Sequence, residues 1–249
     1  LVSSGEIKLG EEVNFVVPTG NFGNILAGYY AKKMGLPVGK LVCASNSNNV
    51  LTEFFADGTY DANREFFKTT SPSMDILVSS NLERLIFEIS GRNAELTAAR
   101  MQELKKSGVY SVTKEELSSL QKEFYADCAD EEECEEEIGG FFDEYGYVLD
   151  PHTAVAVCVA EKYRRYSGDS KVMVTLSTAS PYKFPQSVLR AITGERVSDA
   201  FKSAEKLYKE TACPVPHSIT ALKSKEKRFT TVADKTELKE LVKDFAVKK

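Results

Sequence analysis

The sequence predicts an α/β fold in three layers, a mostly parallel sheet with helices on both faces. Short apolar runs at residues 14–17, 41–45 and 171–177 are typical of buried strands. The first two runs precede stretches compatible with helices, at residues 24–34 and 49–56. This alternation of strand and helix favours a parallel sheet. The length of 249 residues is ample for a sizeable core.

The first strand runs into a loop rich in glycine and asparagine. Residues 14–24 read Asn-Phe-Val-Val-Pro-Thr-Gly-Asn-Phe-Gly-Asn. Gly20 and Gly23 lack a Cβ, so the backbone can bend tightly and approach an anion. The first N–H groups of the next helix lack partners and favour negative charge, and Asn21 and Asn24 add neutral amide donors. The loop therefore predicts a phosphate site, with an ordinary turn as the alternative, and it matches neither the Walker A nor the G-x-G-x-x-G pattern.

The middle third of the chain is predicted to be helical. Apolar residues recur at helical spacing over residues 81–89, 94–106, 114–125 and 131–145. Thr113 and Glu116 have the spacing of a capping box. Six glutamates within residues 131–137 favour a solvated helix face over a metal site. We therefore expect one α/β domain over residues 1–249, with a helical insertion at about 80–148.

A helix is expected to begin at Asp150-Pro151-His152. Asp150 suits the N-cap, and Pro151 suits the first helical position, where its missing N–H is no loss. His152 could serve as an acid or base, and the alternative is a histidine that packs or hydrogen-bonds at the helix start. Two amphipathic helices are expected further on, at residues 198–209 and 234–245.

Composition and charge exclude several classes of protein. The net charge of −5 argues against a nucleic-acid partner that needs a basic face. No apolar run approaches the roughly 18 residues that span a bilayer. The five cysteines lack C-x-x-C spacing, which argues against a disulfide framework or a zinc site, and Cys43 and Cys158 are expected in the core. We expect a cytoplasmic protein with no metal and no nucleic-acid or membrane partner.

Four ordered segments resemble one enzyme family. The run Val-Asn-Phe-Val-Val-Pro-Thr-Gly-Asn-Phe-Gly-Asn-Ile-Leu-Ala-Gly-Tyr-Tyr-Ala at residues 13–31 closely resembles the cofactor-phosphate loop of threonine synthases. These are pyridoxal-phosphate enzymes of the tryptophan-synthase-β class. Residues 176–184, Leu-Ser-Thr-Ala-Ser-Pro-Tyr-Lys-Phe, resemble the family's Thr-Ala-His-Pro-x-Lys-Phe segment, and residues 36–46 and 150–156 are also similar. The resemblance covers residues 13 to about 192, so the expected fold is part of that class.

The resemblance implies roles for particular residues. The cofactor phosphate of pyridoxal 5'-phosphate would be cradled by Gly20, Asn21, Phe22, Gly23 and Asn24. Phe22 would contribute its backbone N–H and close the pocket. Thr178 would contact the pyridine nitrogen, where a neutral hydroxyl makes the ring a moderate electron sink. Lys183 could meet a substrate phosphate or be a surface cation, and the sequence leaves both open.

This chain departs from the family pattern at two positions. Ser180 stands where histidine is frequent, and Tyr182 stands where a small residue is usual. Ser180 can form hydrogen bonds but cannot titrate near neutral pH. A proton-transfer step would be lost if the histidine performed one, and nothing would be lost if it only shaped the loop.

The implied reaction converts O-phospho-L-homoserine and water into L-threonine and phosphate. The lysine that forms the Schiff base with the cofactor precedes the phosphate loop in the family, in a segment resembling Phe-Lys-Asp. Lys8 is the one lysine among residues 1–12, and its surroundings bear no likeness to that segment. We therefore expect a truncated C-terminal portion of a threonine synthase that has no catalytic residue of its own and is inactive alone.

Two alternatives stay open at this point. One is a threonine-synthase-like phospho-lyase that acts on another phosphorylated amino acid. The other is a non-catalytic module that binds phosphate. Because half of such a fold would leave apolar sheet surface uncovered, self-association of the chain is also expected.

Overall fold

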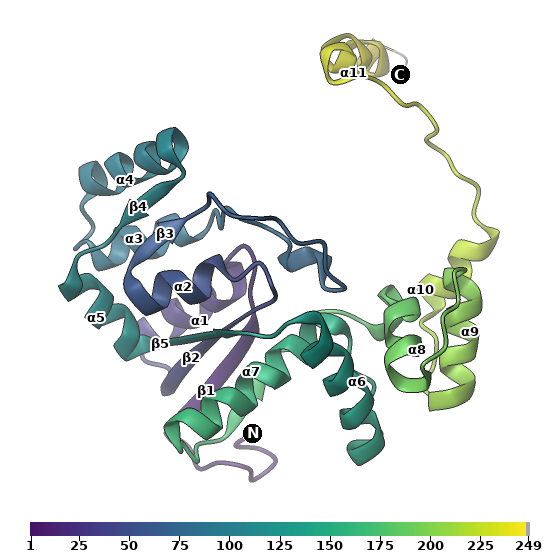
Figure 1. Ribbon diagram of the computed structural model, residues 1–249, viewed down its shortest axis with the longest axis horizontal. Coiled ribbons are helices and arrows are strands. Elements are labelled where there is room, and N and C mark those ends of the chain that lie inside the picture. The colour runs from purple at the N-terminus through teal and green to yellow at the C-terminus, as the bar shows by residue number, and fades with distance from the viewer. Residues whose placement is uncertain (248–249) are drawn as a thin grey trace. The chain divides into compact units, whose positions relative to one another are not determined.

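The computed structural model describes residues 1–247, in two compact units, Leu1–Val215 and Pro216–Lys249. The α/β architecture expected for the whole chain lies in the first unit (Figure 1). The second unit contains the helices α10 (His217–Thr220) and α11 (Leu238–Val247). Two short 3-10 turns, Ala221–Ser224 and Lys235–Glu237, belong to the same unit.

A four-stranded parallel sheet forms the centre of the first unit, as the sequence predicted. Its strands are β1 (Val13–Pro18), β2 (Val38–Ser45), β5 (Phe124–Cys128) and β6 (Met173–Thr175), in the order β5-β2-β1-β6. Val16 of β1 stands opposite Val42 of β2 and Thr175 of β6. The carboxyl ends of β1 and β6 therefore lie side by side, which brings the loops that follow them to the same edge.

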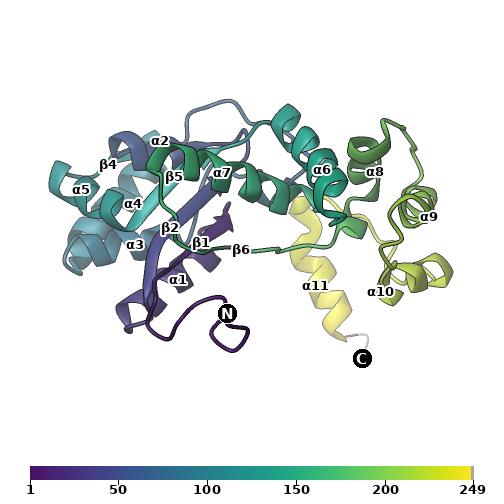
Figure 2. The same ribbon diagram turned by 90° about the horizontal axis from the view of Figure 1, so that it is seen from below.

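Helices cover both faces of this sheet and complete the three layers (Figures 1 and 2). On one face, α7 (Pro151–Ser167) packs across β1, β2 and β5. The opposite face is covered by α1 (Gly23–Lys33) and α2 (Val50–Asp57). The remaining helices are α3 (Leu82–Ile89), α4 (Ala94–Ser107), α5 (Lys114–Glu123), α6 (Glu131–Tyr145), α8 (Pro185–Thr193) and α9 (Ala200–Thr211). Within residues 1–247, no helix has the length and apolar character needed to cross a membrane.

Alternating strand residues build the core between the sheet and α1 and α2. Val17, Leu41 and Cys43 are buried in one cluster with Phe54 of α2. This period of two follows from the pleat of a strand. Burial also raises the pKa of the Cys43 thiol to about 12, and Cys158 of α7 is buried as well. The expectation that these two thiols act as core residues is confirmed.

The region expected to be a helical insertion also contains strands. A short hairpin pairs β3 (Thr59–Asp61) with β4 (Val109–Ser111). The helix predicted over residues 114–125 ends at Glu123, because the chain continues as β5 and pairs with β2. Periodicity cannot separate the last turn of a helix from the first residues of a short strand. The expected insertion therefore supplies an edge strand of the main sheet.

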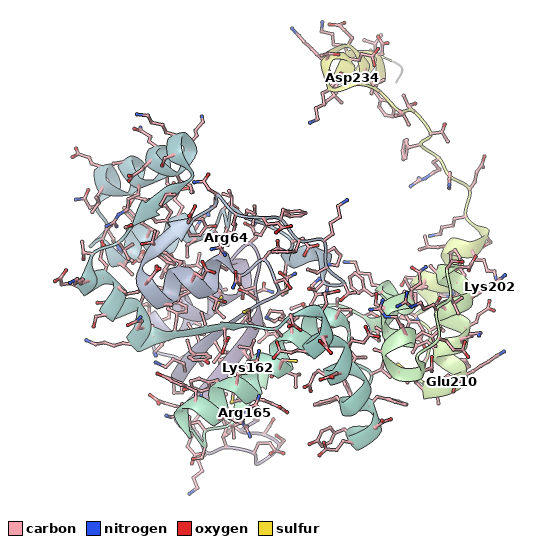
Figure 3. The ribbon with its side chains drawn as sticks, in the orientation of Figure 1. Arg64, Lys162, Arg165, Lys202, Glu210 and Asp234 are labelled. Carbon is pink, nitrogen blue, oxygen red and sulfur yellow. The ribbon has the colours of Figure 1, made fainter. Side chains whose placement is uncertain are left out.

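Lys162 of α7 fastens this edge strand to its neighbours (Figure 3). Its Nζ donates to the Cys128 carbonyl at the end of β5, at 2.8 Å, and pairs with a Glu133 carboxylate oxygen of α6 at 2.6 Å.

Two predicted helix starts are also confirmed. Thr113 and Glu116 form a capping box on α5, and the Asp150 side chain caps α7.

Candidate functional site

A pocket of about 300 Å³ lies at the carboxyl ends of β1 and β6. All seven residues singled out as candidate ligand-binding residues line it, namely Gly20, Asn21, Phe22, Gly23, Asn24, Thr178 and Lys183. The structure adds residues that the sequence analysis had not assigned to the site, chiefly Ser73, Met74 and Asn81, together with His152. Parallel pairing of β1 with β6 explains the convergence, since residues 20–24 and 178 are far apart in the chain.

The first wall is the start of α1, which no side chain caps. Phe22 occupies the N-cap position with φ of 60°, in the left-handed region. Its ring is 1% exposed and packs against Phe55 and Phe124, with centroids 6.0 and 5.8 Å away. Phe22 lines the pocket, and its apolar ring is buried in the core. Burial of the ring anchors the loop, while the first N–H groups of the helix remain for an anion.

Gly20 allows a close approach of two backbone segments. A Cβ at this position would lie 2.9 Å from the Met74 Cα and 3.0 Å from the Ser73 carbonyl oxygen. Both atoms belong to the 3-10 turn η1 (Pro72–Met74), which forms the second wall of the pocket. Glycine is needed here because these are backbone atoms that cannot move aside as a flexible side chain would.

A serine- and asparagine-rich segment before α3 holds the glycine loop in place. Ser79 Oγ donates to the Gly20 carbonyl at 2.8 Å, and Asn81 Nδ2 donates to the Asn21 carbonyl at 2.7 Å. Ser80 donates to Asn21 Oδ1 through both its N–H and its hydroxyl, at 2.8 and 2.7 Å. This segment was not predicted from the sequence, because hydrogen bonds across about sixty positions leave no periodic signal. The Asn21 oxygen thus serves the protein's own structure.

His152 lies at the base of the pocket, 3% exposed. Its Nε2 accepts a hydrogen bond from the Ser73 N–H at 3.2 Å, and its Nδ1 lies 3.1 Å from Asp150 Oδ1. An acceptor at Nε2 places the proton on Nδ1, which then donates to Asp150. This confirms that the histidine hydrogen-bonds at the start of α7, and it also makes His152 a pocket residue.

Asp150 is the N-cap of α7 and orients this histidine. Burial alone would raise the pKa of its carboxyl group, but hydrogen bonds from His152 and Thr153 outweigh burial, and the pKa is lowered. The carboxylate is therefore charged at neutral pH and accepts from the Nδ1–H of the ring.

The opposite side of the pocket follows β6. Thr178 is exposed, and among residues 1–247 its hydroxyl has no hydrogen-bond partner. Lys183 is also exposed, with Nζ 5.6 Å from the centroid of the Phe184 ring, and the described part of the chain offers it no carboxylate. Both groups are free to meet a ligand.

Ser180 and Tyr182, where the chain departs from the family pattern, shape the loop that carries Lys183. Ser180 Oγ accepts from the Tyr182 N–H at 3.3 Å at the start of the 3-10 turn η2 (Pro181–Lys183). The Tyr182 hydroxyl donates to the Cys213 carbonyl, and burial raises its pKa to about 12.

The arrangement defines an α/β protein with a pocket lined by hydrogen-bond donors at the carboxyl edge of a parallel sheet. Uncapped helical N–H groups, neutral amides and the Lys183 ammonium converge there, and these donors suit a phosphorylated ligand.

Comparison with known proteins specifies the family. The profile described as "Threonine synthase, C-terminal" matches residues 153–245. Threonine synthase of Saccharomyces cerevisiae is 41% identical over 201 residues, which are 75% of this chain and 39% of that protein. Threonine synthase-like 1 of Homo sapiens is 40% identical over 210 residues, 84% of this chain and 28% of that protein. The crystal structure of PLP-bound threonine synthase from Brucella melitensis superimposes with a TM-score of 0.78 at 37% identity, covering 93% of this chain and 45% of that chain.

This chain belongs to the threonine synthase family, whose C-terminal portion it matches, and has the fold of the tryptophan-synthase-β class. It spans less than half the length of the relatives that it resembles.

Proposed function

We propose that this chain supplies the phosphate-holding part of the pyridoxal-phosphate site of a threonine synthase. A complete enzyme containing it would convert O-phospho-L-homoserine and water into L-threonine and phosphate. The observation that carries the proposal is the convergence of the uncapped start of α1, Thr178 and Lys183 on one pocket. Family membership supplies the reaction class.

The pocket fits the cofactor by two observations. The approach of η1 to Gly20 shapes a cradle that a Cβ would fill, and the first turn of α1 offers backbone donors without a capping side chain. Residues 20–24 would hold the phosphate, and the Thr178 hydroxyl would address the pyridine nitrogen. The bound cofactor would supply an electron sink for carbanion chemistry. Lys183, a mobile point charge on a flexible stem, would attract the substrate phosphate.

Phosphate recognition can be tested with the chain itself. Calorimetric titration with pyridoxine 5'-phosphate avoids the aldehyde that would react with surface lysines, and pyridoxine serves as the ligand without phosphate. We expect the phosphate ester to bind and pyridoxine to bind at least about tenfold more weakly. Gly23→Asp would abolish the difference by placing a carboxylate at the anion site. Gly140→Asp is the matched control, because a Cβ there meets open space on α6. Equal binding of the two ligands would contradict the proposal.

Catalysis is tested on a full-length enzyme that contains this sequence. We expect phosphate release from O-phospho-L-homoserine by the full enzyme and none by the 249-residue chain. We also expect borohydride treatment of the chain with pyridoxal phosphate to label no single lysine stoichiometrically. Absence of release by a cofactor-loaded full enzyme would rule out the reaction.

A phospho-lyase acting on another phosphorylated amino acid is the second candidate. It is favoured by the 40% identity to threonine synthase-like 1 of Homo sapiens, which equals the similarity to the yeast threonine synthase within one percentage point. Assaying phosphate release from O-phospho-L-homoserine, O-phosphoserine and O-phosphothreonine separates the two. A preference for one of the latter substrates would favour the phospho-lyase.

Self-association and a cytoplasmic location complete the proposal. β6 pairs with β1 on one side, and a groove of about 540 Å³ beside it is lined by apolar residues that include Phe141, Tyr147 and Met173. Such a surface favours association. Sedimentation velocity showing a strict monomer would contradict this part. Five free cysteines fit a reducing compartment, which a fluorescent fusion would test.

A further inference from the structure

The second wall of the pocket, turn η1, is held by several hydrogen bonds, and three of these contacts fix its two ends and its middle. Two of them bracket the turn. Asn46, which is buried, uses its Nδ2 to contact Ser71 Oγ at 3.0 Å and Asp75 Oδ1 at 2.8 Å. These contacts fix the residues just before and just after Pro72–Met74. They do not involve Ser73, in the middle of the turn.

The third point is His152, which reaches the middle of the turn from another element. Its Nε2 accepts the Ser73 N–H at 3.2 Å. Ser73 is also the residue whose carbonyl oxygen would lie 3.0 Å from a Cβ at Gly20. The peptide that contacts the imidazole is thus next to the peptide that presses on the glycine loop.

The orientation of the imidazole is itself determined. Asp150 Oδ1 lies 3.1 Å from Nδ1 and accepts the His152 backbone N–H at 2.9 Å. The ring packs on Phe184, with centroids 4.9 Å apart. A carboxylate beside Nδ1 keeps the proton there, so Nε2 stays an acceptor.

We propose that His152, set by Asp150, is a positioning residue that holds turn η1 against Gly20 and thereby preorganises the phosphate-binding loop. This role differs from acid–base catalysis and from simple packing of α7. It rests on the proposed function only in naming the ligand of the loop as a phosphate. A preformed site binds more tightly because less ordering is needed on binding.

Two variants separate the acceptor from the bulk of the ring. His152→Phe keeps a buried ring and removes the acceptor, whereas His152→Gln places a carbonyl oxygen near the position of Nε2. Pyridoxine 5'-phosphate and pyridoxine are the probes. We expect His152→Phe to weaken binding of the phosphate ester about three- to tenfold, the effect of one lost hydrogen bond. His152→Gln should stay within about twofold of the unmodified chain.

A readout that needs no ligand tests the same contact. Hydrogen exchange of the Ser73 amide should accelerate in His152→Phe and stay protected in His152→Gln. Nitrogen-15 spectra of the unmodified chain should show a proton on Nδ1 and none on Nε2. Thermal denaturation verifies that both variants fold. If His152→Phe does not fold, the inference is decided by the tautomer of His152 in the unmodified chain and by ligand binding and Ser73 amide exchange in His152→Gln.

Three results would overturn the inference. They are unchanged binding and exchange in His152→Phe, equal loss in both variants, and a protonated Nε2. If the unmodified chain bound neither probe, the proposed function would fail, while the Ser73 amide and the tautomer would still decide whether His152 positions the turn.

Discussion

The two sides of the pocket are built differently. On the α1 side, residues 20–24 are tied to residues 79–81 by four hydrogen bonds, and the Phe22 ring is buried in the core. On the β6 side, Thr178 and Lys183 are exposed, and among residues 1–247 neither side chain has a hydrogen-bond or ion-pair partner, although the Lys183 Nζ lies over the Phe184 ring. The strand that leads to them has three residues and, within residues 1–247, pairs with β1 alone.

This difference indicates a division of labour. Residues that the protein already holds by hydrogen bonds lose little entropy when a ligand binds, so the α1 side suits a ligand that remains bound, such as a cofactor. Free side chains near an edge strand can adapt to a second group. The following predictions test whether the α1 side contributes to both stability and binding, and the β6 side chiefly to binding.

The largest expected effect is on the α1 side. Phe22→Ala should lower the free energy of unfolding by about 3–5 kcal/mol, because it removes a buried ring from an aromatic cluster. Urea denaturation measures this loss. Thr178→Ala is the control and should change stability by less than about 0.5 kcal/mol. Similar losses in the two variants would remove the contrast between the sides.

A pair of glycines sharpens the comparison within the α1 side. Gly20→Ala should destabilise the fold by about 1–3 kcal/mol, since the new methyl group meets backbone atoms of Ser73 and Met74. Gly23→Ala should leave stability nearly unchanged, because the nearest atom to its Cβ is Asn81 Nδ2 at 3.6 Å. It should still weaken binding of pyridoxine 5'-phosphate. Unfolding and titration of both variants give the comparison, and equal stabilities would contradict it.

The hydrogen bonds that join β1 to the segment before β6 are expected to be sensitive to acid. Asp169, just before β6, accepts from Asn14 of β1 at 2.9 Å and from the Tyr163 hydroxyl at 3.0 Å. A backbone hydrogen bond from Lys171 and the Asn14 amide lower the pKa of its carboxyl group to about 2. Because the folded pKa lies below the unfolded value of about 3.9, this contribution is present above about pH 4 and is lost as the pH falls towards 2.

Asp169→Asn should therefore lower the free energy of unfolding at pH 7 by about 1 kcal/mol, a value reduced by solvent screening. The difference from the unmodified chain should shrink between pH 4 and pH 2. Denaturation curves across this range measure it. A gap that stays constant would show that the charge of Asp169 does not stabilise the β1–β6 junction.

The smallest effect is expected on the β6 side. Thr178→Val should weaken binding of pyridoxine 5'-phosphate about two- to fivefold through loss of one hydroxyl contact, and Thr178→Ser should retain binding. Neither change should alter the melting temperature by more than a few degrees. Calorimetry at fixed salt provides the measurement. Unchanged affinity in Thr178→Val would remove this residue from the proposed site.

Local chemistry in the sequence was sufficient for much of the fold. The strand before Gly20, the Asp150-Pro151 start of α7 and the capping box at Thr113 rest on neighbouring residues, and the structure confirms all three. Parallel pairing then followed from the alternation of strands and helices. The candidate residues 20–24 and 178 could be named because each follows a strand.

Tertiary structure alone decided what holds those residues. Three features show this: the buried ring of Phe22, the hydrogen bonds from Ser79 and Asn81, and the contact between His152 and Ser73. Each of them joins segments that are 59–79 positions apart or that belong to different elements. Edge strand β5 was not predicted from the sequence for a related reason. Its first residues continue the apolar spacing of α5, so they were assigned to the helix. Hydrophobic periodicity reports which face of an element is buried, but not which distant group it meets there.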